Sequence, residues 1–162
     1  MKRIVTILIA FATLVSCGGT RKKSATPQAV EPLFYTYEVV AEYPHLRTSY
    51  TQGLQFVDGE LWEGTGEYGR SQLLRTDLAS GKVLQSKKLS KEEFGEGITV
   101  LGNKIYQLTW LNGKLHIYDK ATLRHLATHT YKGEGWGLTT DGEKLYMSDG
   151  TNHIRVLNPE TL

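Results

Sequence analysis

Apolar and polar residues alternate along short runs of this chain, and no helical period of convincing length is present. The clearest alternating runs are residues 72–77, 114–119 and 153–158, and each closes on a turn. Asp-Gly or Gly-Asn pairs at 58–59, 102–103 and 141–142 join further apolar runs, and such pairs tolerate the positive φ of tight hairpins. Short runs rich in β-branched and aromatic residues between turns are strands, so the pattern predicts an all-β protein.

The strands recur as copies of one unit. Each copy opens with a Gly-Leu or Gly-Ile pair, continues through a hairpin turn and reaches a Leu-Trp, Ile-Tyr or Leu-Tyr pair. The opening glycines are Gly53, Gly97 and Gly137, spaced by 44 and then 40 residues. Four short strands in about forty residues are typical of a β-propeller blade. The chain is therefore predicted to contain about three blades, in a domain that covers residues 34–162.

The two ends of this domain bear on its completeness. Residues 35–43 are predicted to form a strand ahead of the first repeat, and many propellers give such a strand to their last blade to avoid a free sheet edge. The sequence stops at Leu162, where the last strand of the third blade should begin. Since propellers typically have at least four blades, we expect a sequence truncated at its C-terminus. Part of the active site is then expected to be missing, and the three blades are not expected to fold without the remaining ones.

The first 17 residues have the features of an export signal. Lys2 and Arg3 precede an apolar run over residues 4–15, which is too short to span a bilayer as a stable helix. The run ends in Leu-Val-Ser-Cys, and Cys17 is the only cysteine of the chain. We interpret residues 1–17 as a lipoprotein signal peptide with lipidation at Cys17, and residues 18–33 as a flexible tether. The protein is expected to be exported and anchored by lipid to the bacterial cell envelope, on the periplasmic or outer-membrane side. A plain signal peptide followed by a chance cysteine is the alternative.

Charge and composition exclude several classes of function. Without Lys2 and Arg3 the 19 basic residues fall to 17, which equals the 17 acidic ones, so nucleic acid is not expected as a partner. With Cys17 lipidated, no disulfide, thiolate metal site or cysteine protease chemistry remains. His125 and His129 have the spacing of helical metal ligands, but their segment has the pattern of a strand, in which four residues span about 13 Å. No metal site and no Gly-x-Ser-x-Gly nucleophile motif is therefore predicted.

The repeat alignment itself indicates where a ligand would bind. Gln52, Glu96 and Trp136 each stand immediately before the opening glycine of a repeat. In a propeller the opening strand lines the central channel, so these three side chains are expected to meet around the axis. Polar and aromatic groups that converge in a funnel suit a small-ligand site. The alternative is that Glu96 only pairs with a cation or a turn amide.

Further candidates surround these positions. They are aromatic residues next to the channel, and an acidic and a basic residue that flank a glycine-rich turn: Tyr50, Phe94, Trp110, Glu63 and Arg70. Glu63 and Arg70 could equally be a structural pair. The turn lacks the Gly-Lys-Ser/Thr ending of a phosphate-binding loop and joins two strands.

Five ordered motifs make the chain similar to the plant and bacterial type of glutaminyl-peptide cyclotransferase. They are Tyr50-Thr51-Gln52-Gly53-Leu54, residues 63–71 (Glu-Gly-Thr-Gly-Glu-Tyr-Gly-Arg-Ser), Phe94-Gly95-Glu96-Gly97, Tyr106-Gln107-Leu108-Thr109-Trp110 and Glu134-Gly135-Trp136-Gly137-Leu138. The resemblance implies the fold of a five-bladed propeller. It also implies the activity of an acyltransferase that converts N-terminal glutamine of peptides or proteins to pyroglutamate with release of ammonia. It implies no cofactor and no catalytic zinc.

The resemblance also implies residue roles. Glu96 would be the catalytic acid–base carboxylate, and the substrate-binding residues would be Tyr50, Gln52, Glu63, Phe94, Trp110 and Trp136. Serine is common in the family where this chain has Gly64. Two alternatives stay open: a non-catalytic β-propeller lipoprotein that binds a ligand or a protein, and a lactonase, which holds calcium on the axis with several carboxylates and amides. For the second, only Glu96 and Gln52 are available here.

Overall fold

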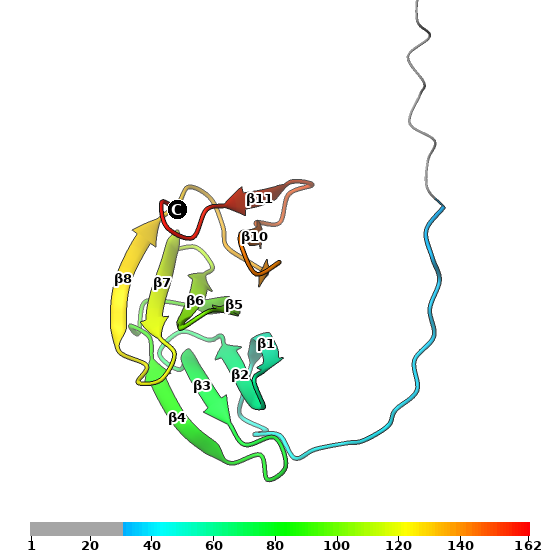
Figure 1. The fold of residues 1–162 in the computed structure, drawn as a ribbon. Coiled ribbons are helices and arrows are strands. Elements are labelled where there is room, and N and C mark those ends of the chain that lie inside the picture. The colour runs from blue at the N-terminus through cyan, green and yellow to red at the C-terminus, as the bar shows by residue number, and fades with distance from the viewer. Residues whose placement is uncertain (1–30) are drawn as a thin grey trace, which may run out of the picture. The chain divides into compact units, whose positions relative to one another are not determined.

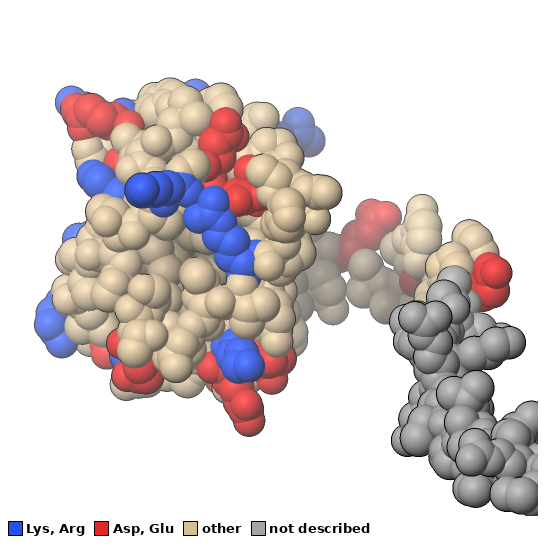
Figure 2. Space-filling view, turned by 90° about the horizontal axis from the view of Figure 1, so that it is seen from above, with Lys and Arg blue, Asp and Glu red and all other residues tan. Residues whose placement is uncertain are grey.

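The computed structural model describes residues 31–162, so the predicted signal peptide, Cys17 and most of the predicted tether lie outside the described residues. The chain divides into two units, residues 1–38 and 39–162, and the strands of the described residues all belong to the second. Within the described part, no helix is long and apolar enough to cross a bilayer. Figure 2 shows that acidic and basic side chains both occur across the face that it presents.

The second unit consists of three antiparallel sheets that follow one another along the chain (Figure 1). The first sheet contains β1 (Thr51–Val57), β2 (Glu60–Thr65), β3 (Gln72–Thr76) and β4 (Val83–Lys88). The second contains β5 (Gly95–Leu101), β6 (Lys104–Thr109), β7 (Lys114–Asp119) and β8 (His125–Thr130). The third contains β9 (Leu138–Thr140), β10 (Leu145–Ser148) and β11 (Ile154–Leu157). Each sheet keeps its strands in chain order, which is the meander of a propeller blade. The predicted all-β architecture with about three blades is confirmed.

The hairpin turns adopt the backbone that their residues favour. Asp58 and Gly59 have φ values of 54° and 77°, which is the positive pair that a two-residue turn between twisted strands requires. Gly102 and Gly142, in the corresponding hairpins of the other two sheets, also have positive φ. These turns set the register in which β1 pairs with β2 and β5 with β6.

The core lies between neighbouring sheets. One apolar cluster joins the first and second sheets, with Trp62 and Leu73 on one side and Ile98 and Ile105 on the other. A second cluster joins the second and third sheets: Tyr106, Leu108, Leu115, Ile117, Leu138, Leu145 and Met147. Each sheet therefore buries apolar side chains against its neighbour, and burial of such side chains is the main stabilising contribution.

The opening strands of the sheets pack backbone against backbone. A Cβ atom added to Gly53 would lie 2.5 Å from the amide nitrogen of Ile98, and one added to Gly97 would lie 2.5 Å from the carbonyl oxygen of Trp136. The Gly97 amide donates a hydrogen bond to that same oxygen at 2.8 Å. Only glycine permits this approach, which explains why glycine stands at positions 53 and 97. In Figure 1, β1 and β5 consequently lie on the inner side of the three sheets, with β4 and β8 on the outer side.

The strand predicted at residues 35–43 is not present. Residues 31–46 form no strand, and the side chains of Tyr35 and Tyr37 are 83% and 91% exposed. A sequence pattern alone does not make a strand, because the backbone needs a neighbouring strand to satisfy its amides and carbonyls. Among the described residues, no strand pairs with this segment.

Candidate functional site

Six of the seven predicted channel and pocket residues line one cavity. It has a volume of about 590 Å³ and is lined by Tyr50, Gln52, Phe94, Glu96, Trp110, Trp136 and Gly137. Gln52 lies on β1 and Glu96 on β5, whereas Trp136 precedes β9. The three positions before the repeat glycines thus converge from three sheets, as the repeat alignment predicts. The volume is that of a small-molecule site.

One wall of the cavity is a row of edge-to-face aromatic rings. Phe94 stands at its centre, with the Tyr50 ring centroid at 6.1 Å and the Trp110 centroid at 5.7 Å. The ring centroid of Tyr68, a residue not predicted to belong to the site, lies 5.5 Å from that of Phe94. The Phe94 ring lies directly over Gly66, where any side chain would overlap it. The glycine-rich turn therefore has a packing role, because it leaves the space that the wall occupies.

Glu96 is the carboxylate within this aromatic cavity. Burial raises the pKa of Glu96 to about 7, hydrogen bonding from Gln52 lowers it, and the negative charge of Glu134 raises it further. A carboxyl group that titrates near neutral pH can both accept and donate a proton under physiological conditions. Such a perturbed pKa in a cleft is a feature of functional carboxylates.

Glu134 joins the two tryptophans of the site. Its Oε2 atom accepts a hydrogen bond from Trp110 Nε1 at 2.6 Å and another from Trp136 Nε1 at 2.8 Å. The two indole donors, that of Trp136 first, hold the pKa of Glu134 below its usual range. Glu134 belongs to the motif at residues 134–138, but the sequence alone indicates no role for it. Its position two residues before Trp136 was the available signal, but its second partner comes from a different sheet.

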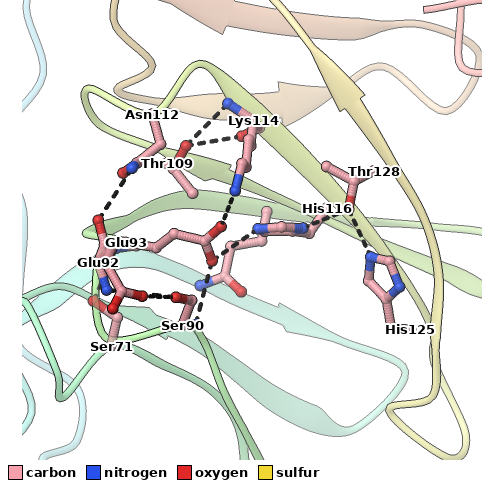
Figure 3. Close-up of polar contacts among 12 residues, drawn as sticks. Ser71, Ser90, Glu92, Glu93, Thr109, Asn112, Lys114, His116, His125 and Thr128 are labelled. Atoms are coloured by element: carbon pink, nitrogen blue, oxygen red, sulfur yellow. Dashed lines mark hydrogen bonds and ion pairs between the residues drawn. The ribbon is translucent and has the colours of Figure 1, made fainter.

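The segment that leads into Glu96 is fixed by a buried polar network (Figure 3). Glu93, only 4% exposed, accepts a hydrogen bond from Lys114 Nζ at 2.7 Å, and its other oxygen lies 3.1 Å from His116 Nε2. Burial acts to raise the pKa of Glu93, but the Lys114 hydrogen bond and the charges of His116 and Lys114 lower it overall. The Gly95 amide donates to Ser71 Oγ at 2.9 Å. Both residues that flank Phe94 are thereby anchored. No pattern in the sequence predicted this network.

Glu63 does not line the cavity. It is 1% exposed and accepts hydrogen bonds from Thr51 Oγ1 at 2.5 Å and Ser49 Oγ at 3.3 Å, and its Oε1 atom lies 3.1 Å from His45 Nε2. The Glu63 carboxylate thus holds the segment before β1 against β2. It does not pair with Arg70, which instead forms an ion pair with Glu67 at 3.0 Å. Glu63 belongs to one of the five sequence motifs, but its position in β2 points its side chain away from the cavity.

His125 and His129 lie in strand β8, as their pattern predicts. The His125 ring contacts the His116 and Tyr118 rings, and its Nε2 atom lies 2.7 Å from Thr128 Oγ1. These side chains belong to the outer part of the second sheet, away from the residues that line the cavity.

Comparison with known proteins gives consistent results. The sequence model of the family described as glutamine cyclotransferase matches residues 8–162. A glutaminyl-peptide cyclotransferase of Arabidopsis thaliana is 41% identical over 128 residues, which are 77% of this chain and 40% of that protein. The crystal structure of Myxococcus xanthus glutaminyl cyclase superposes with a TM-score of 0.69 at 33% identity, over 76% of this chain and 52% of that one.

More distant structures share the fold alone. The structure of U3-55K superposes with a TM-score of 0.57 at 14% identity, over 72% of this chain and 38% of that one. A WD40 β-propeller domain of Doa1 superposes with a TM-score of 0.54 at 19% identity, over 67% of this chain and 36% of that one. This chain spans about half the length of the Myxococcus enzyme and 40% of the length of the Arabidopsis protein. The match of the family model and the identity to the Arabidopsis protein establish that the chain belongs to the glutamine cyclotransferase family.

Proposed function

We propose that this protein is a glutaminyl-peptide cyclotransferase, a metal-independent acyltransferase that converts the N-terminal glutamine of a peptide or protein to pyroglutamate. The observation that carries the proposal is Glu96, a half-buried carboxylate inside an aromatic cavity, with its pKa raised to about 7. The family to which the chain belongs and the identity of the cavity residues support the same activity.

The reaction is an intramolecular acyl transfer. The α-amino nitrogen attacks the side-chain carboxamide carbon of the same glutamine, a new carbon–nitrogen bond closes the five-membered ring, and the bond to the departing ammonia breaks. A free α-amino group has a pKa near 8, so a useful fraction is already neutral and nucleophilic at neutral pH. The step gains most from holding the amine and the carbonyl carbon in an attacking conformation.

Glu96 provides the proton transfer. As a carboxylate it accepts a proton from the attacking amine, and as a carboxylic acid it returns that proton to the departing ammonia. A pKa near the operating pH makes both transfers accessible, because neither protonation state is strongly disfavoured. The Gln52 side chain, beside Glu96 in the cavity, is placed to hydrogen-bond the carboxamide or the oxyanion that develops on it.

The aromatic residues provide the shape. Phe94, Tyr50 and Trp110 form a rigid wall of edge-to-face rings against which the aliphatic part of a glutamine side chain can fold. A folded side chain brings the amine and the carboxamide together. We infer that this wall selects the compact conformer that cyclises.

The test is a peptide that begins with glutamine, followed by mass spectrometry for the loss of one ammonia above the spontaneous background. A peptide that begins with asparagine is the control substrate, since its cyclisation would require a strained four-membered ring. Folded protein that gives no loss above background would reject the proposal.

Glu96→Gln tests the assigned role. It keeps the shape of the side chain but not the proton transfer, and we expect kcat to fall by about 10²- to 10⁴-fold. Glu143→Gln, which removes an exposed carboxylate in the β9–β10 hairpin, is the matched control and is expected to keep full activity. Near-full turnover by E96Q would remove Glu96 from the mechanism.

A further inference from the structure

Two tryptophans from different sheets are held by a single oxygen atom. Trp110 follows β6 of the second sheet, and Trp136 precedes β9 of the third. Both indole N–H groups donate to Oε2 of Glu134, at 2.6 and 2.8 Å. Because both donors share one acceptor, neither indole can rotate without losing its bond. The side chain of Glu134 therefore sets the angle and the separation of the two rings together.

The surrounding backbone supports this arrangement. The amide of Gly135 donates to the Trp110 carbonyl at 3.0 Å, and the amide of Trp136 donates to the Ser148 carbonyl at 3.0 Å. Gly150 lies beneath the Trp136 ring, where an added Cβ would come within 2.8 Å of it. Trp136 is nevertheless 48% exposed, so packing alone does not fix its ring. The hydrogen bond to Glu134 is the contact that determines its orientation.

We propose that Glu134 is a positioning residue of the site, whose carboxylate holds Trp110 and Trp136 as a fixed pair that presents only aromatic faces to the substrate. This inference rests on the proposed cyclotransferase function. Both indole N–H groups are consumed by Glu134, so neither is available to a glutamine carboxamide. Among the residues that line the cavity in the described part of the chain, polar recognition is then left to Gln52 and Glu96, and the tryptophans contribute shape.

The charges around Glu134 are consistent with this role. The neighbouring Arg155 is committed to Asp149, with Nη2 and Nε at 2.7 and 2.9 Å from the same carboxylate oxygen. Its guanidinium therefore does not compete with the indoles for Glu134. The two indole donors keep the pKa of Glu134 low, so the side chain stays ionised while it holds them.

The ionised Glu134 also acts on Glu96. Around Glu96 lie Gln52, the carboxylate of Glu134 and the phenol of Tyr131, which donates to the Thr109 carbonyl at 2.5 Å. Of these, Glu134 alone contributes a negative charge at neutral pH. It adds to the effect of burial in raising the pKa of Glu96. The two carboxylates thus have separate tasks, one fixed and ionised and the other titrating.

Two substitutions separate the geometric effect from the electrostatic one. Glu134→Gln removes the charge and weakens the bonds to both indoles. Glu134→Asp keeps the charge but shortens the side chain by one methylene, so it cannot reach both indoles. Glu143→Gln, an exposed carboxylate elsewhere on the third sheet, is the matched control. All are measured in the purified protein by acrylamide quenching of tryptophan fluorescence and by the pH profile of kcat/KM.

We expect both Glu134 variants to increase quenching, because Trp110 and Trp136 loosen while Trp62, which is fully buried, stays shielded. We expect kcat/KM to fall by roughly 10- to 100-fold in each, as for a displaced catalytic geometry. Only E134Q is expected to move the acid limb of the pH profile to lower pH. E134D carries the quenching test if E134Q does not fold.

Quenching that stays at the wild-type level in a folded Glu134 variant would overturn the proposal, whatever happens to activity. An acid limb that does not move in E134Q would overturn its electrostatic part. The quenching measurement needs no turnover, so it distinguishes a failure of this inference from a failure of the proposed function. Wild-type protein without cyclotransferase activity, but with indoles that loosen in E134Q, would reject the function and keep the role of Glu134 as the residue that holds the indoles.

Discussion

Gly97→Ala tests the backbone contact between the inner strands. The added methyl group would lie 2.5 Å from the Trp136 carbonyl oxygen and 2.6 Å from the Leu138 amide nitrogen, whereas ordinary contact begins near 3.4 Å. The neighbouring atoms are backbone and cannot turn aside, so β5 and β9 must separate by about 1 Å. Overpacking of this kind costs about 1–3 kcal/mol. Weakening the 2.8 Å hydrogen bond from Gly97 to Trp136 adds about 0.5–1.5 kcal/mol. We therefore expect G97A to lose about 2–4 kcal/mol of unfolding free energy.

The assay is equilibrium unfolding in urea, followed by tryptophan fluorescence, with the free energy extrapolated to water. Gly102→Ala is the control, because Gly102 has a φ of +59° but nothing within 4 Å of an added Cβ. Its expected cost is the backbone strain alone, about 1 kcal/mol. If G97A is no less stable than G102A, the inner strands do not pack in the way described, and the explanation of the repeat glycines fails with it.

Two further predictions concern titrating groups. Glu96 must be deprotonated to accept the amine proton, and its pKa is raised to about 7. We therefore expect kcat/KM to increase with pH through about 7 and again near 8, where the substrate amine titrates. An acid limb confined to the usual carboxyl range would contradict this prediction. Glu93→Gln should lose about 1–3 kcal/mol of stability in urea unfolding near neutral pH, because Lys114 and His116 lose their charged partner. The pKa of Glu93 is lowered in the folded protein, so its contribution to stability is present above the usual glutamate pKa and disappears as the pH falls through the folded value. The difference in unfolding free energy between E93Q and wild type should therefore shrink in acid. A difference that stays constant with pH would contradict the assignment.

The cavity could be predicted from the sequence because the repeat fixes equivalent positions. Gln52, Glu96 and Trp136 occupy the same place in successive units, and any architecture that stacks such units must bring them together. The aromatic neighbours Phe94 and Trp110 follow from the same argument, since each lies at the end of an inner hairpin. Repetition converts a local pattern into a three-dimensional one.

The features that the sequence did not reveal depend on contacts between residues that lie far apart in the sequence. Glu134 acquires its role only when Trp110, 24 residues earlier in the chain, lies beside it, and Glu93 acquires its role only when Lys114 and His116 of β7 lie beside it. The role of Glu63 likewise depends on contacts with His45 and Ser49, which precede β1, and with Thr51 of β1. Residues 35–43 were predicted to form a strand, but a strand forms only with a partner, which no sequence pattern within the segment can supply.

The glycine contacts between the inner strands have an evolutionary consequence. At residues 53 and 97 the spacing of neighbouring blades is set by main-chain atoms, so the side chains one position earlier do not determine that spacing. An amide and a carboxylate occupy those two positions, and an indole occupies the corresponding position 136 of the third repeat. Mutation can therefore exchange the chemistry around the axis one blade at a time while the framework persists. The repeat thus separates what must be conserved for folding from what is free to be selected for catalysis.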